Sequence, residues 1–195
     1  SFFSALADRR EIRMRLRITS DKPVALYIGG LDAWKGVHTF LGIATLVPHV
    51  HVAVIGGSDA EVASLRIQHP LVQFLGARPY RELPENQQAA DILVIPNNAK
   101  NILSSSYTSP LKLFAHMTSR VPLVISDIPS LRAILDEESA YFFAPDDPHA
   151  LAKAIAQVLK NPKEAHEKAF RAYELSKHYT WKERARAILD AQLNQ

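Results

Sequence analysis

The sequence predicts an α/β fold in which a doubly wound, parallel, six-stranded sheet carries helices on both faces. Short apolar runs recur along the chain, and several are nearly continuous in apolar residues, as expected of strands covered on both faces. Helical patterns alternate with these runs, which is the order of successive βα units. The predicted strands are Val24–Gly29, His51–Gly56, Val72–Gly76, Asp91–Pro96, Pro122–Ser126 and Ala140–Phe143.

The predicted helices complete a Rossmann-like domain. Those between strands are Val37–Leu46, Ala60–Gln68, Glu85–Ala90, Leu111–Thr118 and Ser130–Asp136. Two longer helical stretches follow the last strand, Asp147–Leu159 and Ala165–Leu193, with breaks at Asn161-Pro162 and near Tyr179. We therefore expect a single domain over residues 1–195, with an entry helix or linker at 1–20, a core at 21–160 and C-terminal helices at 161–195.

An arginine-rich helix is predicted ahead of the first strand, over Ala5–Arg17. Its arginines at positions 9, 10, 13 and 17 recur at helical spacing. A solvated helix face is the favoured interpretation. A stripe that binds lipid or a partner is the alternative.

The amino-acid composition indicates which kinds of ligand and which cellular compartment suit this chain. The 23 Lys and Arg residues nearly balance 20 Asp and Glu residues, and the pI near 9.2 is only mildly basic, so we expect anionic small ligands and no nucleic-acid partner. The absence of cysteine fits a reducing compartment, and a cytoplasmic location is expected. No apolar run approaches the roughly 20 residues of a membrane helix. The missing initiator Met indicates a piece of a longer protein.

The sequence gives little support for a metal site or for a catalytic nucleophile. The eight histidines are scattered, so no metal site is predicted. His116 follows Lys112 by one helical turn, and a packed or surface histidine is the favoured interpretation. No Ser-His-Asp set and no pair of catalytic carboxylates can be assembled. The segment Ser126–Ser130 is expected to cap a helix that contains Arg132.

The loops after the first three strands are candidates for ligand binding, because ligands bind beyond the carboxyl ends of such strands. Gly29 and Gly30 permit close backbone approach, and Lys35 adds a charge, so this loop is predicted to hold a phosphate. An ordinary tight turn is the alternative. Gly57 follows the second strand, ahead of a cap at Ser58 or Asp59. After the third strand, Ala77–Tyr80 offers backbone groups to a flat base, or forms a structural turn.

The most informative segment is the predicted helix start after the fourth strand. Ser109 is a good N-cap and Pro110 a good first helical residue. Lys112 stands where a capping box would place Glu, at the positive end of the helix dipole. A diphosphate held by backbone N–H groups, Lys112 and Lys35 would relieve this conflict. The alternative is a Lys112 side chain that extends into solvent.

Taken together and in order, these segments resemble family four of the glycosyltransferases. The matching segments are Tyr27–Leu31, Trp34–Gly36, Val72–Gly76, Ser109–Phe114, Pro122–Arg132, Tyr179–Trp181 and Arg184-Ala185. The chain is similar to the C-terminal domain of those retaining enzymes, which have the two-domain B-type fold. The resemblance covers nearly the whole chain.

The resemblance implies a donor site for a UDP- or GDP-type nucleotide sugar, with no metal and no other cofactor. It places Lys35 and Lys112 near the diphosphate, Ala77 and Arg78 beside the base, and Tyr107–Leu111 at the donor sugar and phosphates. Tyr107 and Lys112 become the best catalytic candidates. The resemblance also implies a separate N-terminal domain with the acceptor site, a catalytically inactive isolated domain, and optional peripheral attachment of the parent protein to a membrane.

Two departures from the family pattern leave other functions open. Gly30 stands where the family usually has Arg, and Tyr107 and Ala115 stand where it has a pair of Glu residues. The Ala115 position normally contacts the ribose hydroxyls. The alternatives are therefore a non-catalytic binding or scaffolding module of the same fold, or a sugar-nucleotide epimerase. Apolar positions of Trp181–Leu193 are expected to pack against another domain or a second copy.

Overall fold

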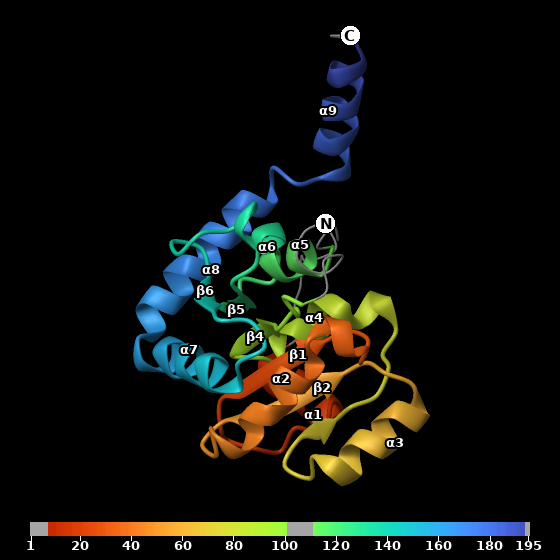
Figure 1. Cartoon of the computed structure of the whole chain (residues 1–195), viewed down its shortest axis with the longest axis vertical. Coiled ribbons are helices and arrows are strands. Elements are labelled where there is room, and N and C mark those ends of the chain that lie inside the picture. The colour runs from red at the N-terminus through yellow and green to blue at the C-terminus, as the bar shows by residue number, and fades with distance from the viewer. Residues whose placement is uncertain (1–7, 101–110, 194–195) are drawn as a thin grey trace.

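A computed structural model describes residues 8–100 and 111–193 (Figure 1). Strands and helices alternate as the sequence predicts. The strands are β1 (Val24–Ile28), β2 (His51–Ile55), β3 (Gln73–Phe74), β4 (Ile92–Ile95), β5 (Leu123–Ser126) and β6 (Tyr141–Phe143). The α-helices are α1 (Arg9–Arg15), α2 (Val37–Gly42), α3 (Asp59–Gln68), α4 (Leu83–Gln88), α5 (Leu111–Met117), α6 (Pro129–Arg132), α7 (Pro148–Lys160), α8 (Pro162–Ser176) and α9 (Trp181–Leu193). Short 3-10 turns occur at Ala33–Lys35, Ile43–Thr45 and Tyr80–Glu82.

All strand pairs in the sheet are parallel, and the strand order is β3-β2-β1-β4-β5-β6. The chain crosses from β3 at one edge to β4 in the centre, so the direction of winding reverses between β1 and β4. This is the doubly wound order, and it places the ligand crevice at the carboxyl ends of these two central strands. The predicted fold class is confirmed.

Helices cover both faces of the sheet, because each strand sends alternate side chains in opposite directions. On one face, Ala25 and Tyr27 of β1 pack with α2 and α7 through residues such as Phe40 and Ile155. On the other face, Leu26 packs with α1, α4, α5 and α6; the buried members include Ile12, Ala89, Leu113, Met117 and Leu131. The near-continuous apolar runs follow from this two-sided burial.

Several element boundaries differ from the prediction. The third strand contains only two residues, since it lies at the edge of the sheet and pairs with β2 alone. The first helix after β1 tightens to a 3-10 turn at Ile43. The predicted helix at Ser130–Asp136 is a single turn, Pro129–Arg132. The capping prediction for Ser58 is correct. Its hydroxyl accepts a hydrogen bond from the Glu61 amide, and the Glu61 carboxylate accepts one from the Ser58 amide.

The predicted solvated basic face is present in part, because Arg9, Arg10 and Arg17 are exposed whereas Arg13 is partly buried. Arg9 and Arg13 form ion pairs with Asp91 at 2.8 and 2.7 Å, and Arg15 pairs with Glu85. The helix is fixed beneath them by buried apolar residues such as Ile12. The arginines therefore attach α1 to the segment that precedes β4.

Asp91 should matter more for stability than its surface position suggests. Besides two arginines, it accepts the Val24 amide at 2.7 Å at the start of β1. Asp91→Ala should lower the free energy of unfolding by about 1–3 kcal/mol, because it leaves the partly buried Val24 N–H group without its acceptor and removes the ion pairs of Arg9 and Arg13. Urea denaturation measures this loss. Glu85→Ala, which breaks only the exposed Arg15 pair, is the control and should cost no more than about 1 kcal/mol. Equal losses would contradict the assignment.

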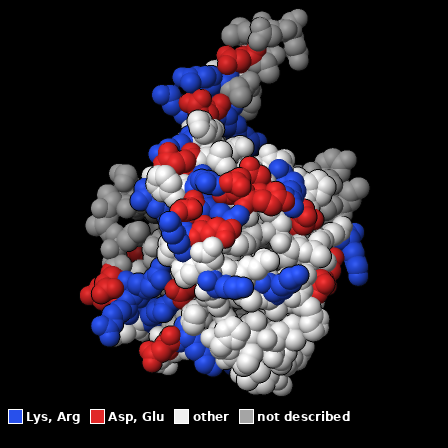
Figure 2. Space-filling model, turned by 90° about the vertical axis from the view of Figure 1, so that its left-hand side faces the viewer, with Lys and Arg blue, Asp and Glu red and all other residues white. Residues whose placement is uncertain are grey.

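The C-terminal helices follow the last strand. Asp147 caps α7 by accepting the amides of His149 and Ala150, and the predicted break at Asn161-Pro162 separates α7 from α8. The helix α9 begins after the predicted break near Tyr179 and extends away from the body (Figure 1). Over the face seen in Figure 2, basic and acidic side chains lie side by side. None of the described helices is long and apolar enough to cross a membrane.

Candidate functional site

The loop after β1 forms the base of the candidate site. Gly29 has a φ of +156°, and its amide donates to the Ile55 carbonyl of β2. Gly56 at the end of β2 lies against it so closely that a Cβ on Gly56 would come 1.9 Å from the Gly29 carbonyl oxygen. The two strand ends therefore hold each other's backbone, and only glycine permits this approach.

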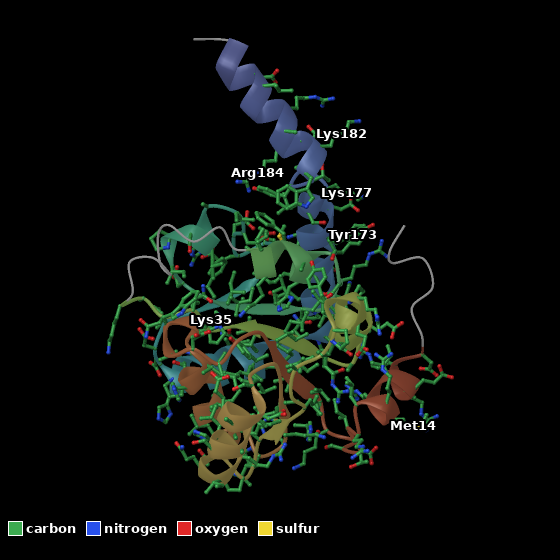
Figure 3. The ribbon with its side chains drawn as sticks, turned by 90° about the vertical axis from the view of Figure 1, so that its right-hand side faces the viewer. Met14, Lys35, Tyr173, Lys177, Lys182 and Arg184 are labelled. Carbon is green, nitrogen blue, oxygen red and sulfur yellow. The ribbon has the colours of Figure 1, made fainter. Side chains whose placement is uncertain are left out.

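Lys35 lies over this loop. Its ammonium group is 2.7 Å from Asp32 Oδ2 and 5.0 Å from the centre of the Trp34 ring. A Cβ on Gly30 would lie 2.5 Å from Lys35 Nζ, so the cation sits directly above the Gly30 backbone. Figure 3 shows Lys35 on the side of the molecule opposite Met14 of α1. That position is expected for the carboxyl end of β1, because α1 precedes the strand.

Lys112 reaches the same loop from α5. Its Nζ would be 2.7 Å from a Cβ on Gly29, and it lies 3.3 Å from the Tyr27 hydroxyl and 4.3 Å from the centre of the Tyr27 ring. The Tyr27 hydroxyl in turn donates to the Gly30 carbonyl at 2.6 Å. The two predicted phosphate cations, Lys35 and Lys112, are thus brought together over two adjacent glycines.

The electrostatics of this pair favour an anion. Burial lowers the pKa of Lys112 to about 7, and the charge of Lys35 lowers it further in the same direction. Burial also raises the pKa of Tyr27, so its hydroxyl stays protonated. Among the ion pairs between described residues, none involves Lys112. An anion placed between the lysines would stabilise the charged form of Lys112.

His116 takes no part in the charge of the site. Its side chain is 1% exposed, and Nδ1 lies 2.9 Å from Gln87 Nε2. Because the amide NH2 group donates to Nδ1, the ring proton resides on Nε2. Burial, with the nearby charge of Lys112, lowers the pKa of His116 to about 3. The histidine is therefore neutral and packed, as the sequence analysis favoured.

A second part of the candidate site is a hollow of about 800 Å³ beside the outer face of α5. Leu111 and Ala115, one turn apart on α5, line this hollow together with Tyr80. The connection from α8 to α9 supplies the remaining lining, which is His178, Tyr179, Thr180, Trp181, Glu183 and Arg184 together with Phe114 of α5. The first turns of α5 thus carry Lys112 toward the glycine loop and Leu111 toward this hollow.

Other predicted residues are less directly placed. Gly57 packs against Leu31, since a Cβ there would lie 2.3 Å from a Leu31 methyl carbon, and it supports the loop from behind. Ala77 and Arg78 are exposed after β3. Tyr107, Ser109 and Pro110 lie outside the described residues, so the predicted N-cap and the catalytic candidate Tyr107 remain predictions.

Sequence reasoning missed two residues that hold the lysines. No role in the site is predicted for Tyr27, although its place two residues before a pair of glycines is a signal that its side chain could return to the loop. Asp32 precedes Lys35 by three residues, which is the spacing of a local ion pair. The segment Ser126–Ser130 contains the N-cap of α6, as expected, but this residue is Ile128 and makes no side-chain capping bond. Asp127 instead forms a two-bond pair with Arg132.

A parallel sheet of this order defines a Rossmann-like domain, and its two lysines over a glycine loop lie at the central carboxyl ends where such domains bind ligands. Residues 8–175 match the family of glycosyl transferases group 1. Because the match covers most of the chain, the protein belongs to this family.

Curated relatives agree with this assignment. The chain is 24% identical over 193 residues to a D-inositol 3-phosphate glycosyltransferase of Xylanimonas cellulosilytica, covering 93% of this chain and 45% of that protein. It is also 24% identical over 149 residues to the putative teichuronic acid biosynthesis glycosyltransferase TuaC of Bacillus subtilis, covering 76% and 36%. The chain therefore spans less than half the length of these relatives.

Solved structures confirm the fold. The C-terminal domain of a glycosyl transferase group 1 protein, LpcC of Francisella tularensis, superposes with a TM-score of 0.70 at 19% identity, covering 92% of this chain and 97% of that one. HepE of Anabaena in complex with UDP and glucose gives 0.75 at 17% identity, covering 91% and 49%. The fold is thus that of the C-terminal domain of B-type glycosyltransferases, as the sequence resemblance implied.

Proposed function

We propose that this chain is the donor-binding domain of a retaining glycosyltransferase that transfers a hexosyl unit from a nucleoside diphosphate without a metal ion. The observation that carries the proposal is the convergence of Lys35 and Lys112 on the Gly29-Gly30 backbone. Two ammonium groups at one loop suit a diphosphate, whose negative charge increases as the sugar–phosphate bond breaks. HepE, which shares the fold, has been solved with UDP-glucose.

Each part of the site has a distinct role in this proposal. The lysines bind the diphosphate and stabilise it as the leaving group. The loop Ala77–Tyr80 and the hollow beside Ala115 take the base and ribose. Tyr107 contacts the donor sugar. The acceptor and the remaining catalytic groups belong to an N-terminal domain, so this chain alone binds the donor without turnover.

A non-catalytic module is the second candidate, and Ala115 is the observation that favours it. Alanine there offers no oxygen to the ribose hydroxyls, and a missing charged hydrogen bond reduces binding by about 1–3 kcal/mol. Such a module would have kept the fold without nucleotide binding. An epimerase would instead interconvert a nucleotide sugar without any acceptor.

Isothermal titration of the chain with UDP, GDP and ADP tests the proposal, once with magnesium and once with EDTA. We expect one of the nucleotides to bind equally in both conditions. Ala115→Glu should tighten that binding by about 1–3 kcal/mol, because it restores a ribose acceptor. Leu111→Glu, which adds the same charge to the same hollow one turn earlier, is the control and should give no such gain. Absence of binding at millimolar nucleotide, for both the wild type and Ala115→Glu, would favour the module.

A further inference from the structure

The ion pair between Asp32 and Lys35 occupies the place where a phosphate would contact the loop. A Cβ on Gly30 would lie 2.8 Å from Asp32 Oδ2 as well as 2.5 Å from Lys35 Nζ. Both charged groups therefore stand above the same glycine. A phosphate that reaches Lys35 at this loop meets the Asp32 carboxylate, and two anions at hydrogen-bond distance from one ammonium group repel each other.

The orientation of the Asp32 side chain is not that of a helix cap. It is the N-cap residue of the turn Ala33–Lys35, and aspartate at an N-cap commonly accepts a backbone amide with its side chain. Here the carboxylate makes no capping bond. It turns to Lys35 instead, and the hydrogen bond and charge of Lys35 lower the pKa of Asp32. The pair is open to solvent, with side-chain exposures of 26% for Lys35 and 50% for Asp32.

The two lysines consequently differ. Lys112 is held by an uncharged hydroxyl and an aromatic ring, both from Tyr27, whereas Lys35 is already neutralised by a carboxylate. A ligand anion gains the full attraction of Lys112. It gains that of Lys35 only when Asp32 moves aside or tolerates a shared cation.

We infer that Asp32 is an internal counter-ion of the donor site, which competes with the nucleotide diphosphate for Lys35 and thereby weakens its binding and assists its release. The inference rests on the proposed function, since it needs a phosphate at Gly30. Asp32 would thus set the affinity for the nucleotide without making a favourable contact with it. The half-exposed side chain of Asp32 has room to rotate away when the phosphate arrives.

Titration with UDP, with GDP and ADP in parallel, tests the inference on Asp32→Asn, which removes the charge and preserves the shape. We expect Asp32→Asn to bind about twofold to fivefold more tightly than the wild type, the range of a solvent-exposed ion pair. In a Lys35→Gln background the gain should be smaller, because the contested cation is gone and only the direct repulsion between the Asp32 carboxylate and the phosphate is left. A purely structural role of Asp32 would survive in that background. Asp21→Asn, at the opposite end of β1, makes the same change in net charge and should leave affinity unchanged.

The outcomes distinguish failure of the counter-ion role of Asp32 from failure of the proposed donor site. If the wild type binds a nucleotide and Asp32→Asn binds it equally or less tightly, the counter-ion inference is overturned and the donor site stands. If the gain is undiminished in Lys35→Gln or also occurs in Asp21→Asn, it has another origin and the inference is overturned as well. If neither the wild type nor Asp32→Asn binds any of the three nucleotides, the proposed function fails, and the inference fails with it.

Discussion

Gly36→Ala should destabilise the fold far more than Gly76→Ala, although both glycines have the same positive φ of +70°. Gly36 has a φ of +70° and connects the turn that carries Lys35 to α2. A Cβ there would lie 1.6 Å from the carbonyl oxygen of Pro96, just beyond β4. The clash involves backbone on both sides, so no side chain can rotate to relieve it. We expect a loss of about 3–5 kcal/mol in the free energy of unfolding.

Gly76→Ala is the matched control for this prediction. Gly76 has the same φ of +70°, but nothing lies within 4 Å of the position of its Cβ. Its substitution should therefore cost only the left-handed backbone conformation, about 1–2 kcal/mol. Urea denaturation followed by circular dichroism measures both variants. Equal losses would show that the Pro96 contact contributes nothing and that only the backbone conformation matters.

Lys112→Met should weaken nucleotide binding and at the same time stabilise the fold. Removing a partly buried cation that contacts phosphate should reduce affinity by about 1.5–3 kcal/mol, or roughly tenfold to 150-fold. The unliganded fold should gain, because methionine fills the space beside Tyr27 without a buried charge. Titration measures the first effect and thermal unfolding the second, where each kcal/mol gained should raise Tm by about 2–4 °C. Loss of both affinity and stability would contradict the assignment.

The buried Lys112 side chain should make the free energy of unfolding rise with pH above neutrality. In the folded chain the pKa of Lys112 is about 7, whereas the ordinary value is 10.5. Below pH 7 both the folded and unfolded chains hold the proton, and burying the charge opposes folding. Between pH 7 and 10.5 the unfolded chain holds the proton that the folded chain has lost, so stability rises with pH. Lys112→Met should lack this part of the rise.

Nucleotide binding should show the opposite trend. Above pH 7 the terminal phosphate, with a pKa near 6, is fully ionised, so further change comes from the protein. The free site loses the Lys112 proton in this range, and affinity should fall as pH rises from 7 to 9. Lys112→Arg keeps its charge throughout and should flatten the profile. An unchanged slope in Lys112→Arg would assign the pH dependence to another group.

Much of the fold could be predicted because burial on both faces of a parallel sheet leaves a strong local signal. The runs at β1, β2 and β4 are almost wholly apolar, and glycines end the first two. The ends of helices and strands were predicted less accurately, since contacts with neighbours in space determine where each one stops. The third strand shortened because it lies at the sheet edge, and the arginines of α1 bind Asp91, which is 78 residues away from Arg13.

The sequence by itself determined that Lys35 and Lys112 lie at the same end of the sheet. Each follows a predicted strand, and the carboxyl ends of parallel strands meet at one edge. Only the tertiary structure decided what holds each lysine: Asp32 for the first and the Tyr27 hydroxyl and ring for the second. The physical reason is that the strand order determines where the strand ends lie, whereas hydrogen bonds and ring contacts between side chains depend on rotamers that packing selects.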